Sequence, residues 1–178
     1  MSTVTTILSS KESVGTWNLV SGESSMLFEN ATAWGALKVR GAFTEFSGDG
    51  QITEAKTVSG RVDIKAASID TGLGRRDDDL RSADFFDVEK YPEISVVVTG
   101  GQLVGDDRAR LDAELTVKGV TGKLPLEVAI TALDDGSVQL KTHTTVTRKQ
   151  FKVEGNFFGM VGAKTKLRVC LVFRRAAI

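Results

Sequence analysis

The side chains best suited to chemistry are few in this chain, and their spacing does not favour catalysis. His143 is the single histidine and Cys170 the single cysteine. A typical metal triad needs a second histidine, and Ser–His or Cys–His catalysis needs a partner for the histidine that no nearby residue supplies. We interpret His143 as a solvent-facing strand residue and Cys170 as a structural thiol. The sequence predicts no catalytic residue, no metal site and no enzyme.

A charged run at 75–79 is the other place where chemistry is conceivable. Asp77, Asp78 and Asp79 follow Arg75 and Arg76. Three consecutive aspartates lack the alternating spacing of a calcium loop, so we interpret them as the charged start of a short helix. The two arginines have two open interpretations: they pair with the aspartates, or they meet an anionic head group.

The length, charge and hydropathy of the chain limit the classes of protein to which it can belong. The chain has 178 residues and a formal net charge of +0, so nothing in the totals predicts attraction to nucleic acid or to an anionic membrane. No apolar run approaches ~20 residues, which argues against an integral membrane protein. The N-terminus lacks the basic and apolar regions of a signal peptide, so we expect a cytoplasmic protein. We expect a flexible arm over 1–14 and a single domain over 15–178.

Apolar and polar residues alternate along most of the chain, most clearly over 109–118. This period of two predicts strands with one buried face and one wet face. Turn residues such as Asp49-Gly50, Gly100-Gly101 and Asp135-Gly136 separate the runs. We expect eight or nine strands, near 16–20, 24–30, 35–46, 52–69, 93–99, 108–118, 123–133, 137–147 and 164–174.

Long antiparallel strands without intervening helices favour an all-β, up-and-down barrel of eight strands, wide enough inside for packed side chains or one small ligand. The alternation stops in two places. We expect a short inserted helix around 77–87, and 148–163 is a glycine-spaced loop with three phenylalanines. Both segments carry aromatic residues that together would form a hydrophobic mouth.

Several segments resemble the YceI-like family. They are RDDDLRSADFFDVEKYPEI at 76–94, ELTVKGVTGKLPLEV at 114–128 and VRGAFTEFSGDGQI at 39–52, and the resemblance continues in order from about Trp17 to Phe173. It implies a lipocalin-like antiparallel barrel that holds a long apolar chain, typically a polyisoprenoid or related amphiphile, often in a homodimer and without catalysis. Where relatives usually carry histidines, this chain has Glu23 and Asp79.

We therefore expect non-catalytic binding, storage or transport of an isoprenoid-type lipid, with a polyisoprenoid, quinone or fatty-acid-like molecule as ligand and no cofactor. Two alternatives stay open: a lipid isomerase or cyclase on the same barrel, and a ligand-free stress or assembly protein whose barrel is filled by side chains. Arg75 and Arg76 are the head-group candidates. The predicted lipid-binding residues are wall positions taken from the alternation and aromatic or apolar residues guarding one end: Leu37, Val39, Phe43, Ile94, Val96, Val98, Leu115, Val146, Trp34, Leu80, Phe85 and Phe86.

Overall fold

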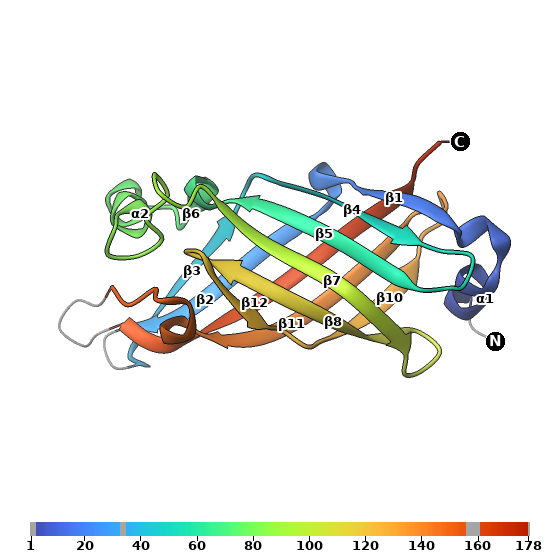
Figure 1. Cartoon of the computed structure of the whole chain (residues 1–178). Coiled ribbons are helices and arrows are strands. Elements are labelled where there is room, and N and C mark those ends of the chain that lie inside the picture. The colour runs from blue at the N-terminus through green and yellow to red at the C-terminus, as the bar shows by residue number, and fades with distance from the viewer. Residues whose placement is uncertain (1–2, 33–34, 156–160, 178) are drawn as a thin grey trace.

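A sheet of antiparallel strands closes on itself around a central axis in this computed structural model, which describes residues 3–32, 35–155 and 161–177 (Figure 1). The strands are β1 (Gly15–Leu19), β2 (Ser25–Thr32), β3 (Leu37–Phe43), β4 (Phe46–Ile52), β5 (Val58–Lys65), β6 (Ile69–Asp70), β7 (Glu93–Leu103), β8 (Arg108–Val117), β9 (Val120–Lys123), β10 (Leu126–Ala132), β11 (Val138–Thr147) and β12 (Val161–Arg175).

Strand β12 closes the ring. One of its edges pairs with β11, and the other pairs with β2 over most of its length and with β1 near its end, where Trp17 opposes Arg175. From β2 the ring continues through β3 and β4, which are consecutive in the chain and together occupy one strand position of the barrel. It then passes through β5, β7, β8 and β10 and returns to β11. The expected closed, eight-stranded antiparallel barrel with one short inserted helix is confirmed.

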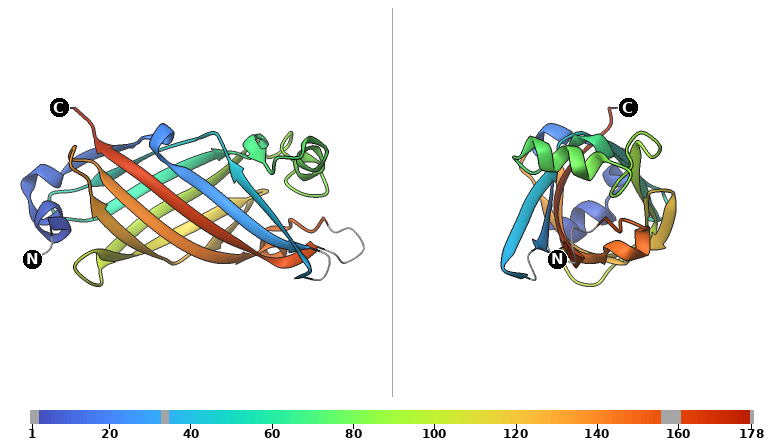
Figure 2. Two further views of the ribbon diagram at one scale, coloured as in Figure 1. Left: turned by 180° about the vertical axis from the view of Figure 1, so that it is seen from behind. Right: turned by 90° about the vertical axis from the view of Figure 1, so that its left-hand side faces the viewer.

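Helical segments cover the two ends of the barrel (Figures 1 and 2). At one end lie α1 (Thr3–Ser9) and the 3₁₀ turn η1 (Lys11–Ser13), and at the other lie α2 (Gly74–Arg81) and η5 (Arg148–Phe151). Two further turns, η2 (Ser21–Glu23) and η4 (Ala66–Ser68), lie between strands. The two ends are called the α1 end and the α2 end below.

The inserted helix begins earlier than the expected 77–87 and ends at Arg81. Asp77 lies in its first turn, where an acidic residue is favourable, and its carboxylate accepts hydrogen bonds from the backbone N–H and the hydroxyl of Thr71. This contact ties the helix to the chain before it. Residues 83–86 form turns instead of a last helical turn, because Phe85 N–H bonds to the carbonyl of Ser82.

The N-terminal segment, where we expected a flexible arm over 1–14, contains α1 and η1. Val4 and Leu8 are four residues apart and therefore share one face of this helix. Val4 is only 7% exposed and packs in a cluster with Ala109, Val128 and Ile130. The surrounding serines and threonines concealed this short apolar face in the sequence.

Glycine pairs that looked like turns lie inside strands. Gly50 pairs with Gly60 across β4 and β5, and Gly100 and Gly101 belong to a bulged part of β7. Strands β4 and β5 approach each other closely, because a Cβ on Gly48 of β4 would lie 2.5 Å from the carbonyl oxygen of Arg61 on β5. The real turn follows β4, where Lys56 has a φ of 63°. The turn expected at Asp135-Gly136 is present, with Gly136 at a φ of 84°.

Candidate functional site

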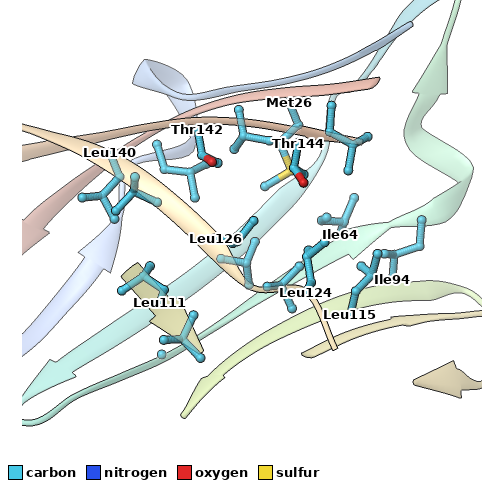
Figure 3. Close-up of a pocket in the computed structure, with 18 of the residues that line it drawn as sticks. Met26, Ile64, Ile94, Leu111, Leu115, Leu124, Leu126, Leu140, Thr142 and Thr144 are labelled. Atoms are coloured by element: carbon cyan, nitrogen blue, oxygen red, sulfur yellow. The ribbon is translucent and has the colours of Figure 1, made fainter. Parts of the chain in front are cut away.

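A cavity of about 720 Å³ occupies the inside of the barrel (Figure 3). Its lining extends from Leu8 and Ser9 at the α1 end to Leu80 and Phe86 at the α2 end. The volume falls within the ~300–1,000 Å³ range of small-molecule sites in proteins. The barrel is therefore hollow, and the alternative of an interior filled by its own side chains is wrong.

The strands create this cavity by presenting aliphatic side chains inward and, at one place, no side chain at all. Every barrel strand contributes to the lining, and Figure 3 shows leucines and isoleucines from several strands pointing into the same space. Gly50 and Gly60 also face it. A Cβ on Gly50 would have a single heavy atom within 4 Å, the carbonyl oxygen of Ser59 at 3.5 Å, so the space beside this glycine is open.

Most of the predicted lining residues lie on the cavity wall. Some are strand positions with the inward direction that the alternation indicated, and the others come from α2 and the segment that follows it. They are Val39, Phe43, Leu80, Phe85, Phe86, Ile94, Val96, Val98, Leu115 and Val146. Their contact with a lipid stays a prediction. Phe43 and Phe86 touch edge to face, with ring centroids 5.9 Å apart, and so connect the barrel wall to the segment that covers the α2 end.

Leu37 does not line the cavity and is 64% exposed. It lies on the same face of β3 as Val39, but β6 pairs with β3 only at Ala42 and Phe43, so Leu37 extends past the closed part of the wall. The alternation of apolar and polar residues predicts which face of a strand a side chain lies on, but it does not predict where along the strand the closed wall of the barrel ends. Trp34, predicted to guard an end, lies outside the described residues.

The two head-group candidates have different surroundings. Arg76 lines the cavity, and it donates from Nε to the hydroxyl of Thr71 at 2.8 Å and from Nη2 to the Thr71 carbonyl at 2.9 Å. Arg75 is exposed and away from the lining. Within the described chain, neither arginine forms an ion pair with the aspartates, and Asp78 pairs instead with Arg81 at 3.1 Å.

The positions at which relatives usually carry histidine are separated in space. Asp79 lies on α2 at the edge of the cavity lining, close to Arg76 along the helix. Glu23 lies in η2, away from the lining, and pairs with Arg174 at 3.3 Å. The structure therefore does not join them into one site.

Several polar residues on the wall escaped the sequence reasoning, among them Thr142, Thr144, Thr165 and Asn30. Asn30 is 8% exposed; its Nδ2 donates to the Lys164 carbonyl and to the Thr165 hydroxyl, and its Oδ1 has no partner in the described part of the chain. The sequence did contain a signal for the inward direction of two of them, because Thr142 and Thr144 lie on the same face of β11 as Leu140 and Val146. Their polar type concealed their inward direction.

Arg148 provides the strongest polar contacts at the α2 end. It donates to the carbonyls of Gly162 at 2.8 Å, Val153 at 2.7 Å and Gly155 at 3.1 Å. Partial burial lowers the pKa of its guanidinium below the ordinary value, although arginine keeps its proton near neutral pH. The side chain ties the segment after η5 to the start of β12.

The described residues were also compared with the requirements of a metal centre and of a membrane span. Across 3–32, 35–155 and 161–177, no three His, Cys, Asp or Glu side chains gather closely enough to hold a metal ion. Within the same ranges, no helix has the length and hydropathy needed to cross a bilayer.

Known proteins share this architecture. BcnA of Burkholderia cenocepacia superposes with a TM-score of 0.77 at 21% identity, covering 86% of this chain and 98% of that one. A polyisoprenoid binding domain from Saccharophagus degradans, implicated in plant cell wall breakdown, gives a TM-score of 0.75 at 17% identity and covers 90% and 98% of the two chains. At these identities the likeness concerns the fold.

Sequence similarity is stronger over a shorter stretch. A UPF0312 protein of Pseudomonas putida F1 is 38% identical over 85 residues, 47% of this chain and 44% of that protein. Protein YceI of Escherichia coli O17:K52:H18 is 34% identical over 97 residues, 53% and 50% of the two chains. The chain spans about half the length of the curated relatives it matches. The sequence profile of the YceI-like domain matches residues 17–173, and the chain belongs to this family.

Proposed function

We propose that this protein binds a long apolar chain of the isoprenoid type inside its barrel, without transforming it. The observation that carries the proposal is the cavity of about 720 Å³, lined by aliphatic side chains from every barrel strand. The Saccharophagus degradans neighbour is a polyisoprenoid binding domain, which supports the same ligand class. The binding would serve to store the lipid or to transport it.

The energetics of such a ligand are favourable. Each methylene group transferred from water to an apolar cavity contributes about 0.8 kcal/mol, so about ten methylenes contribute about 8 kcal/mol. This gross gain is comparable to the ~4–15 kcal/mol lost when a ligand gives up its free translation and rotation. A longer chain that fills more of the cavity would therefore bind with useful affinity.

The interior chemistry supports binding over catalysis. The polar side chains of the described lining include Thr142, Thr144, Thr165 and Asn30, and none of these four titrates near neutral pH. Charged residues on the lining include Arg76, Asp79 and Arg148 at the α2 end, and Asp49 and Arg61 on β4 and β5. Arg76 is the side chain that we propose to meet a polar head group.

A matched pair of tryptophan variants tests the proposal. Val96 lines the cavity, whereas its neighbour Val97 on β7 lies on the other face of the strand, between Arg61 and Glu114. Val96→Trp places an indole in the cavity and is expected to abolish uptake of a fluorescent polyene chain. Val97→Trp makes the same change in side-chain volume outside the barrel and is expected to leave uptake within twofold of the wild type.

Circular dichroism should confirm that both variants keep the strand content of the wild type. If the two folded variants take up the polyene equally well, the barrel interior is not the binding site. A wild-type protein that takes up neither polyene nor any other long-chain lipid would likewise overturn the proposal.

A further inference from the structure

Strands β11, β12 and β2 lie side by side and form one outer wall of the barrel (Figure 2, left). The outward residues of this wall carry an excess of positive charge. Along β11 and β12, every second residue points outward, and these positions include four exposed cations: Lys141, Lys164, Lys166 and Arg168. We refer to these four residues as the basic wall. The formal net charge of +0 for the whole chain conceals this uneven distribution.

The four cations of the basic wall are not neutralised by neighbours. None of them forms an ion pair with any described carboxylate. Glu29 of β2, which stands opposite Lys166 in the β2–β12 register, is already bound by Arg40 at 2.8 Å and Lys38 at 3.5 Å. The hydrogen bond from Arg40 lowers the pKa of Glu29, so this carboxylate stays ionised and engaged on the β3 side.

The opposite wall has the contrary arrangement. There, Arg61 of β5 pairs with Asp63 at 2.8 Å. Between that wall and β11, Arg108 of β8 pairs with Glu127 of β10 at 2.9 Å. Strand β8 also presents Asp112 and Glu114 to the outside. Among the described strands, the basic wall therefore carries four exposed cations without an ion pair, whereas the opposite wall presents charges of both signs.

An apolar group accompanies the cations. Leu27 of β2 is 43% exposed and lies directly beside Arg168 in the β2–β12 register. Basic side chains beside an exposed leucine fit the interface of a bilayer, where cations meet lipid phosphates and apolar groups reach the acyl region.

We propose that the basic wall docks this protein on a membrane surface that contains anionic lipids. Nucleic acid is a poorer match, because single-stranded sites need aromatic stacking platforms, and the outward residues described on β11, β12 and β2 include no Phe, Tyr or Trp. The surface is distinct from the cavity, and docking would bring the barrel to the phase in which long-chain lipids reside.

Vesicle sedimentation tests the docking. The probes are phosphatidylcholine vesicles with and without about 30 mol % phosphatidylglycerol, at low and high salt. The wild type is expected to bind the anionic vesicles at low salt and to dissociate as salt rises, because screening weakens exposed charges. Pure phosphatidylcholine vesicles should not bind.

Two double variants with equal loss of charge locate the contact. Lys166→Gln with Arg168→Gln neutralises the basic wall and should weaken vesicle binding roughly 25-fold, since each cation near such a surface contributes about a fivefold factor. Arg110→Gln with Lys123→Gln removes two exposed cations from β8 and β9, on the other wall, and should change binding less than about twofold. Leu27→Ser should weaken it several-fold.

Three results would overturn the proposal: no binding of the wild type to anionic vesicles, equal losses for the two double variants, or binding to a single-stranded oligonucleotide without binding to vesicles. Val96→Trp blocks the cavity and leaves the basic wall intact, so it should still bind the vesicles. Failure of lipid uptake and failure of docking are thus measured separately.

Discussion

At the α1 end of the barrel, Val4 and Leu8 cover the interior by packing on apolar residues of β10 and β11. At the α2 end, Phe85, Phe151 and Val153 are also buried in the apolar core, and arginine side chains hold the covering segments through backbone carbonyls as well. Apolar packing cannot be exchanged for water without cost at either end, but a hydrogen bond between a charged side chain and a carbonyl can be replaced by bonds to water. The difference suggests which end opens to admit a ligand.

The α1 end is fastened in several ways. The indole N–H of Trp17 donates to the Ser13 carbonyl at 2.9 Å, and the ammonium of Lys56 donates to the Ser13 hydroxyl at 3.1 Å. Arg175 of β12 also donates to the Val14 carbonyl. These contacts hold η1 and the start of β1 against the barrel, so we expect this end to stay closed.

At the α2 end, the ladder of backbone hydrogen bonds is less complete. Strand β3 pairs with β6 only at Ala42 and Phe43, and the chain from 66 to 92 covers the gap beyond. Arg81 holds this chain by bonds to the carbonyls of Ala67 and Ile69. We therefore predict that ligands enter and leave through the α2 end, past Leu80 and Phe86.

The largest expected effect comes from removing the arginine that ties the α2 end. Arg148→Ala leaves three carbonyls without their donor and should lower the free energy of unfolding by about 2–4 kcal/mol. Denaturant unfolding measures the loss. Arg148→Lys should recover part of it, and Lys149→Ala, at an exposed neighbour, should change little. Equal stability of Arg148→Ala and Lys149→Ala would remove the role assigned to Arg148.

A smaller loss of stability is expected at the α1 end. Val4→Ala deletes two methyl groups from a site that is 7% exposed and should lower the free energy of unfolding by about 1–2 kcal/mol. Lys11→Ala changes an exposed residue of η1 and serves as the control. If both variants unfold at the same denaturant concentration as the wild type, α1 does not contribute to closing the barrel.

The kinetics of ligand release compare the two ends directly. Phe86→Ala removes an aromatic contact with Phe43 at the α2 end and should accelerate release of a bound polyene about tenfold, the factor that corresponds to 1.4 kcal/mol. Leu8→Ala trims the lining at the α1 end and should leave the release rate within about twofold. Stopped-flow displacement measures both rates. Faster release from Leu8→Ala than from Phe86→Ala would place the mouth at the α1 end.

The smallest expected effect is a loss of thermal stability at acidic pH. The hydroxyl and backbone N–H of Ser137, together with Arg174, lower the pKa of Asp135 in the β10–β11 turn to about 2 from 3.8. A depressed carboxyl pKa stabilises the fold fully above pH 3.8, and this stabilisation is lost as the pH falls towards 2. The wild type should therefore lose more thermal stability than Asp135→Asn across this window. Parallel losses would show that Asp135 is not the group involved.

The alternation in the sequence predicted the barrel and much of its wall, because a period of two fixes which face of a strand is buried. Ile94, Val96, Val98 and Leu115 lie on the lining for that reason. Alternation could not show where the wall ends, so Leu37 was placed inside, and it could not show that a threonine points inward. The pairing of Gly50 with Gly60, which enlarges the interior, depends on the neighbouring strand and was mistaken for a turn.

The covering segments were less predictable still. Helix α1 depends on Val4 and Leu8 finding an apolar surface on β10 and β11, which are more than a hundred residues away in the sequence. The position of α2 depends on the bonds from Thr71 to Asp77. Such tertiary contacts override local patterns. The expected homodimer and cytoplasmic location stay predictions.

Native mass spectrometry of the freshly purified chain, followed by organic extraction, tests the central claim most directly. The account predicts a species heavier than the bare chain by the mass of one isoprenoid-type lipid, and extraction should recover that lipid and leave the bare chain. Val97→Trp should carry the same added mass, and Val96→Trp should not. A bare chain in every preparation, with no lipid acquired after incubation with an isoprenoid quinone, would contradict the claim that the barrel holds a long apolar chain.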